Sequence, residues 1–139
     1  MFEDARSLPF PSRKYPVITL CGSTRFKEQF LEAQKRLTLA GNIVISVGLF
    51  GHSGDEEVWT EGTKEMLDDM HKRKIDMADG IFVINVGGYI GQSTRSEIDY
   101  ALAHGKKVEF LEKTGPMDGV ESEMRVKNDC GADARSGRA

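Results

Sequence analysis

The run GIFVINV, residues 80–86, is the feature that most constrains how this chain can fold. It is almost without polar interruption, which is typical of a parallel strand that is buried on both faces. Parallel strands need crossover connections, and these are usually helices. We therefore expect a parallel sheet with helices packed on both of its faces.

Strand-like and helix-like segments alternate along the chain. Short apolar runs predict further strands at residues 16–21, 42–47 and 107–112. Helical spacing of apolar residues predicts a helix that ends at Gly41, and further helices at about residues 60–78 and 94–104. This order implies right-handed crossovers. The predicted fold class is α/β, a Rossmann-like three-layer sandwich with a small, mainly parallel sheet of four or five strands.

The domain organisation follows from the same pattern. A chain of 139 residues suits one domain. Residues 1–15 carry mixed charge and prolines and are expected to form an arm, and residues 16–113 hold the α/β domain. Residues 114–139 are polar and glycine-rich without periodicity, so we expect a tail that is partly disordered.

Composition excludes several classes of function. A net charge of -3 argues against non-specific binding of nucleic acid, which needs a basic footprint. We find no apolar run long enough for a membrane span and no signal-peptide pattern. The two cysteines, Cys21 and Cys130, form neither a disulfide framework nor a zinc-binding spacing. A reducing compartment is the simplest interpretation, so we expect a cytoplasmic protein.

Two turns follow the first and third predicted strands, at the sheet edge where α/β folds bind ligands. The first is CGSTR. Its glycine, Gly22, permits close approach of the backbone, and Ser23, Thr24 and Arg25 offer hydroxyls and a cation that suit a phosphate or a sugar. Ser and Thr are also common helix N-caps, so a purely structural role is open.

The second turn is GGYIGQST, and a helix opens after it. Its glycines permit unusual backbone angles, and hydroxyls cluster beside them. The substrate-binding candidates here are Gly88, Tyr89, Gly91, Ser93 and Thr94. Glu97 follows, and two roles are open for its carboxylate. Thr94 and Glu97 have the spacing of a capping box, while a carboxylate kept ionised near the positive end of a helix could also serve as a nucleophile.

The helix at about residues 60–78 supplies a third group of candidates. His71 shares an apolar stripe with Leu67 and Ile75, so we expect it to face inward as a core residue or as an active-site residue. Asp69 and Asp76 lie on neighbouring stripes. In the preceding loop, aromatic residues could edge a base-binding pocket or simply pack the loop down; they are Phe50, His52 and Trp59.

Three segments together resemble the nucleoside 2-deoxyribosyltransferase-like superfamily, which includes nucleoside deoxyribosyltransferases and nucleoside 5'-monophosphate N-glycosidases. They are VITLCGSTRF, MADGIFVIN and GQSTRSEIDYALAHGKKV, and the resemblance spans about residues 16–112. The CGS-x-R pattern is especially similar to the N-glycosidase branch. The segment GGYIGQSTRSE also resembles, more loosely, the signature of cytokinin-type phosphoribohydrolases, which cleave the same kind of bond.

The resemblance implies cleavage or transfer at the N-glycosidic bond of a nucleoside or nucleoside 5'-monophosphate. In the family, the glutamate that matches Glu97 attacks C1' of the sugar, and water or a second base resolves the glycosyl-enzyme. Because the carboxylate supplies the nucleophile, we expect that no metal and no organic cofactor is needed. Family members carry a catalytic aspartate where this chain has His71, so His71 or Asp76 is expected to take that role, with Asp69 as a further option. The implied partner is a small nucleoside or nucleotide, and a homodimer or larger assembly is expected by analogy.

A second function class is compatible with the same residues. A catalytically silent nucleotide-binding module would keep the two turns but would not need the missing helix aspartate. Hydrolysis and transfer differ only in whether water reaches the intermediate. Both remain open, as do the identity of the sugar and the base.

Overall fold

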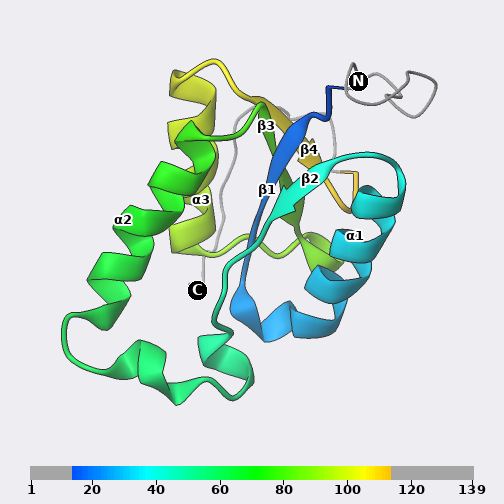
Figure 1. Cartoon of the computed structure of the whole chain (residues 1–139). Coiled ribbons are helices and arrows are strands. Elements are labelled where there is room, and N and C mark those ends of the chain that lie inside the picture. The colour runs from blue at the N-terminus through cyan, green and yellow to red at the C-terminus, as the bar shows by residue number, and fades with distance from the viewer. Residues whose placement is uncertain (1–13, 114–139) are drawn as a thin grey trace.

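The computed structural model describes residues 14–113, and these form an α/β fold with one parallel sheet (Figure 1). The sheet has four strands, β1 (Val17–Gly22), β2 (Ile43–Ile45), β3 (Gly80–Ile84) and β4 (Lys107–Phe110). Their order is β2-β1-β3-β4, and every pairing is parallel. The predicted fold class is confirmed, whereas most of the expected arm and all of the expected tail lie outside the described residues.

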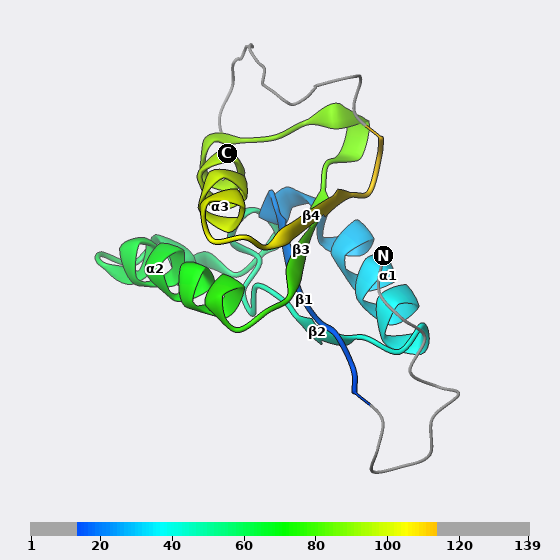
Figure 2. The same ribbon diagram turned by 90° about the horizontal axis from the view of Figure 1, so that it is seen from above.

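Helices cover both faces of the sheet, as the view from above shows (Figure 2). One face carries α1 (Lys27–Leu39), and the other carries α2 (Thr63–Asp76) and α3 (Gln92–Ala103). Between them lie short 3-10 turns, η2 (Thr24–Phe26), η3 (Gly51–Ser53), η4 (Glu56–Trp59) and η5 (Val86–Gly88). None of the helices within residues 14–113 has the length and apolarity to cross a membrane.

The apolar run in β3 is explained by its two buried faces. All five residues of the strand are buried. Phe82 and Ile84 pack into a cluster with Phe30 of α1, whereas Ile81 and Val83 pack into a second cluster with residues of α2 and α3. Successive side chains of a strand point to opposite faces, so a strand covered on both sides must be apolar throughout.

Two expected helix starts differ from the observed ones. The predicted helix at about residues 60–78 begins later, at Thr63, because Gly62 before it has a φ of 82°. Such a backbone angle suits glycine and interrupts a helix. The predicted helix at 94–104 begins earlier, at Gln92, after Gly91 in an extended conformation. Thr94 is therefore the third residue of α3 and not its N-cap.

Candidate functional site

A cavity opens at the carboxyl ends of β1 and β3, at the edge where the sequence placed both turns. Its lining comes from the first turn, from α2, from the start of α3 and from the loop that precedes α2. The residues from β1, the first turn and the helices are Gly22, Ser23, Thr24, Lys64, Leu67, Asp68, His71, Ser93, Thr94 and Glu97. Seven of the predicted site residues line this cavity together. They are Gly22, Ser23 and Thr24 of the first turn, Ser93 and Thr94 at the start of α3, and His71 and Glu97.

Gly22 begins the first turn and can be replaced by no larger residue without strain. Its φ is +149°, and a Cβ there would lie 2.9 Å from the backbone oxygen of Ile84 in the neighbouring strand. Angles in this region are rarely adopted by residues with a side chain. Glycine therefore lets β1 stay paired with β3 up to the cavity edge, which brings both turns to the same point.

The hydroxyls of the first turn already have partners in the protein. Ser23 Oγ accepts hydrogen bonds from the backbone N–H of Arg25 at 3.3 Å and from its Nε at 3.1 Å. This contact caps the η2 turn, so the capping role considered for Ser23 is confirmed. Thr24 Oγ1 accepts from the backbone N–H of His52 at 3.1 Å and lies 2.9 Å from its Nδ1. The turn is thus fastened to the loop that closes the cavity.

Several predicted ligand contacts lie outside the cavity lining. The Arg25 guanidinium stacks 4.6 Å from the centre of the Tyr89 ring, and Tyr89 also meets the Phe26 ring edge-on. Gly88 and Gly91 are likewise not part of the lining. The aromatic stacking draws Arg25 away from the cavity toward the η5 turn.

The capping-box alternative for Glu97 is wrong. The N-cap of α3 is Gly91, and no side chain caps the helix there. A capping box needs its hydroxyl residue at the N-cap and its carboxylate at the third helical position. Thr94 is itself the third residue and Glu97 the sixth, so the Glu97 carboxylate extends from the second turn of α3 into the cavity.

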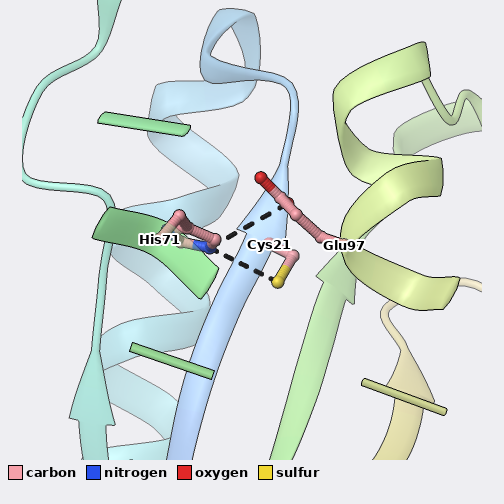
Figure 3. A group of neighbouring side chains, drawn as sticks. All are labelled: Cys21, His71 and Glu97. Atoms are coloured by element: carbon pink, nitrogen blue, oxygen red, sulfur yellow. Dashed lines mark hydrogen bonds and ion pairs between the residues drawn. The ribbon is translucent and has the colours of Figure 1, made fainter. Parts of the chain in front are cut away.

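Glu97 meets His71 and Cys21 in a compact group that draws on three elements (Figure 3). His71 Nε2 of α2 lies 3.9 Å from Glu97 Oε1 of α3 and 3.4 Å from Cys21 Sγ of β1. The side chains of His71 and Glu97 are only 7% and 13% exposed, and Cys21 is fully buried. Their potential ligand atoms all lie within 4.8 Å of one another.

Burial governs the protonation of this group. It raises the pKa of Glu97 to about 7, although a hydrogen bond from the Cys21 thiol acts in the opposite direction. It lowers the pKa of His71 to about 4, with the charge of Lys74 adding to the effect. Burial also raises the pKa of Cys21 well above its usual value. Desolvation disfavours every charged form, so at pH 7 His71 and Cys21 are neutral and Glu97 is about half ionised.

The expectation that a helix end keeps Glu97 fully ionised is therefore not met. The dipole effect is confined to the first turn of a helix, and Glu97 lies beyond it. A carboxyl with a pKa of about 7 exchanges its proton near neutral pH, and a neutral imidazole beside it can accept one. This pair can support nucleophilic attack or proton transfer, and such perturbed groups are typical of functional sites.

Asp76, proposed as an alternative catalytic residue, is not part of the cavity lining. Its carboxylate accepts a hydrogen bond from the Tyr100 hydroxyl at 2.7 Å and pairs with Arg73 at 3.2 Å. Asp69 lies on the exposed side of α2, 4.0 Å from the same arginine. Both carboxylates take part in a surface network between α2 and α3, and Tyr100 contacts Asp76, not Glu97.

The sequence analysis missed Cys21, Lys64 and Asp68. Lys64 and Asp68 line the cavity and pair with each other at 3.0 Å. Together with His71 they are spaced by four and three residues, which is one face of a helix, so helical periodicity could have found them. Cys21 gave no such signal, because its neighbours in space are far from it in the sequence.

Aromatic groups line one side of the cavity, as the sequence suggested for Trp59 and His52. Both residues belong to the lining, their rings meet edge-on at 5.1 Å, and Trp59 Nε1 donates to the backbone oxygen of Gly51 at 3.2 Å. Trp59 is 49% exposed, so one part of its ring is accessible. Phe50 is instead buried and packs against Phe30.

Comparison of the chain with protein-family models, with curated proteins and with solved structures finds no match. The function of this protein is therefore inferred from its own motifs and from the geometry of its cavity. The buried Glu97–His71 pair, the hydroxyl-bearing turns and the aromatic wall are the features that any function has to use.

Proposed function

We propose that this protein cleaves the N-glycosidic bond of a nucleoside or nucleoside 5'-monophosphate, or transfers the sugar to a second base, through Glu97. The observation that carries the proposal is the position of the Glu97 carboxyl. It is nearly buried, free of a capping role, and lines a cavity at the carboxyl ends of β1 and β3. Ligands of parallel α/β folds bind at this edge.

The proposed chemistry is a double displacement. An ionised Glu97 oxygen attacks C1' of the sugar, the bond from C1' to the base nitrogen breaks, and the base leaves with the bonding electrons and takes up a proton. Water or a second base then attacks C1' and releases the carboxylate. His71 lies 3.9 Å from Glu97 and is neutral near pH 7, so it is suited to accept the proton of the attacking water.

Charge and shape in the cavity suit the rest of such a substrate. The Lys64 ammonium lines the cavity and would offset a 5'-phosphate, and the first turn of α3 at Ser93 and Thr94 presents N–H donors of the kind that bind anions. The accessible Trp59 ring offers a stacking surface for a base. All of these groups line the same cavity as Glu97, which supports a substrate whose sugar would lie near that carboxyl, between a bound phosphate and a stacked base.

The second candidate, a nucleotide-binding module without turnover, is favoured by one observation. Asp76 does not reach the cavity, so the position of the family aspartate is filled by His71 alone. Neutral His71 cannot supply the negative charge that an aspartate would place beside the sugar. Binding without base release would support this candidate.

The test is release of free base from a panel of nucleosides and 5'-monophosphates, measured by liquid chromatography. We expect the native chain to release base, and Glu97→Gln to lower the rate by on the order of 10²–10⁴-fold. The matched control is Glu32→Gln, which makes the same change on the exposed surface of α1, across the sheet. Equal rates for Glu97→Gln and the native chain would remove Glu97 from the mechanism.

Mass spectrometry provides a second, independent readout. If the reaction is stopped with acid during turnover, the peptide that contains Glu97 should carry the mass of the sugar, and the Glu97→Gln peptide should not. A rapid reaction without this adduct, together with inverted configuration at C1', would show direct attack by water and would refute double displacement.

A further inference from the structure

The proposed reaction assigns no step to Cys21, although its sulfur belongs to the same compact group. Cys21 is fully buried, its Sγ lies 3.4 Å from His71 Nε2, and its thiol lies near enough to the Glu97 carboxyl for that group to raise its pKa. A thiol, an imidazole and a carboxyl thus converge from β1, α2 and α3 (Figure 3). These are the three side-chain types that bind zinc in proteins.

We infer that Cys21, His71 and Glu97 form a binding site for a thiophilic divalent cation, of which Zn²⁺ is the representative. Ligand atoms about 2.0–2.3 Å from a tetrahedral zinc ion lie roughly 3.3–3.8 Å from one another. The 3.4 Å between Cys21 Sγ and His71 Nε2 already fits this spacing. The 3.9 Å between His71 Nε2 and Glu97 Oε1 is close to it, and all three ligand atoms lie within 4.8 Å of one another, so binding requires the Glu97 carboxyl to move toward the other two groups.

The orientation of His71 supports this inference. Its ring also forms a hydrogen bond with the backbone of Leu20, the residue next to Cys21, and this bond favours the protonated ring. The backbone group therefore accepts a ring N–H. Histidines that bind metals typically donate their second ring N–H in this way, which holds the other nitrogen toward the ion.

The charges of the group match those of a divalent ion. A Cys21 thiolate and a Glu97 carboxylate would together carry two negative charges, so a bound Zn²⁺ would leave the buried group neutral. Binding would release the thiol proton, and the carboxyl proton where it is present, to solvent. Two lysines, Lys64 and Lys72, act on Glu97 and oppose a cation, whereas Asp68 favours one.

The cavity leaves one side of the site open. Three protein ligands with a fourth position for water are typical of zinc sites that are not purely structural. A bound ion would hold the Glu97 oxygen that the proposed reaction needs, so it would act as an inhibitor of that reaction. The inference itself rests on the ligand geometry and does not depend on the proposed function.

The test uses the full chain, treated with a chelator, desalted and titrated with Co²⁺ as a spectroscopic substitute for Zn²⁺. We expect saturation at one equivalent, the strong visible bands of four-coordinate Co²⁺, and a thiolate-to-cobalt charge-transfer band in the near ultraviolet. Zn²⁺ should displace the cobalt and abolish the bands. A competing chelator of known affinity gives the dissociation constant.

Variants assign the ligands. Cys21→Ala should abolish the charge-transfer band, and Glu97→Gln should weaken binding by at least the ~10–100-fold that loss of a supporting partner costs. The control is Cys130→Ser, which removes the other cysteine of the chain and should keep the band. Circular dichroism checks that each variant is folded.

Two outcomes would overturn the inference. One is a folded native chain that shows no charge-transfer band with excess Co²⁺, a result that needs no variant. The other is a band that survives in Cys21→Ala and disappears in Cys130→Ser, which would place the metal elsewhere. Neither outcome bears on base release, so the inference and the proposed function can fail separately.

Discussion

Replacing Glu97 by glutamine should change how the stability of the protein depends on pH. Burial raises the pKa of Glu97 from 4.5 to about 7 in the folded protein. One pKa unit corresponds to about 1.4 kcal/mol, so ionised Glu97 costs the folded state about 3 kcal/mol relative to its protonated form. Glutamine keeps the size and the polar contacts of the carboxyl, and it has no proton to lose.

The direction follows from proton binding. Between pH 4.5 and about 7, folded Glu97 keeps a proton that the unfolded chain releases, so the folded state binds more protons. Stability that Glu97 provides at low pH is therefore lost as the pH rises through this window, and the loss is complete above it. We expect the free energy of unfolding of Glu97→Gln, relative to the native chain, to rise by about 3 kcal/mol from pH 4.5 to pH 8.

The neighbours of Glu97 enter this prediction because they face it from two other elements. They are Cys21 of β1 and Lys64, Asp68, His71 and Lys72 of α2. His71 titrates in both proteins, and its pKa of about 4 when folded destabilises both at acidic pH. The comparison between variant and native chain removes this shared effect.

The assay is urea unfolding of the native chain, Glu97→Gln and Glu32→Gln at several pH values between 4.5 and 8, with a chelator present. The exposed Glu32→Gln should follow the native chain throughout. A Glu97→Gln difference that does not change with pH would refute the desolvation argument. A difference that becomes less favourable as the pH rises would show that the carboxylate is stabilised by a partner in the folded state.

Three further predictions concern single residues. If a base stacks on the exposed ring, Trp59→Ala should weaken nucleoside binding by about 1–3 kcal/mol. Calorimetric titration measures the affinity, and an unchanged affinity would contradict stacking on Trp59. Gly22→Ala should destabilise the fold by about 1–3 kcal/mol, because its Cβ would meet the oxygen of Ile84 at 2.9 Å; an unchanged melting temperature would contradict the strain. Asp76→Asn should leave the rate of base release within about twofold of the native rate, because the partners of Asp76 are Tyr100 and Arg73 outside the cavity. A large loss of rate would show that Asp76 takes part in the reaction.

Much of the fold was predictable because it follows local rules. The apolar run at β3, the helical spacing around Phe30 and the inward position of His71 are periodic patterns, and burial imposes such patterns on the sequence. The two turns could be assigned to one edge of the sheet because parallel strands end on the same side. The four parallel strands and the two helical layers confirm that inference.

The site was less predictable. The spacing of Thr94 and Glu97 is the same in a capping box and in a helix that starts three residues earlier, and only the start of α3 at Gln92 separated the two. The sequence drew attention to Asp69 and Asp76, whereas Asp68, which shares a helix face with Lys64 and His71, was overlooked. The orientation of α2 against the sheet decided which of the three carboxylates lines the cavity.

The sequence by itself determined which segments become strands and helices, because the burial of each element's own faces leaves a periodic pattern of apolar residues in its sequence. Only the tertiary structure decided that the Cys21 thiol meets His71 and Glu97, because contacts between elements depend on how strands and helices pack across many residues. The same packing removes water from the three groups, and that desolvation sets the pKa of Glu97.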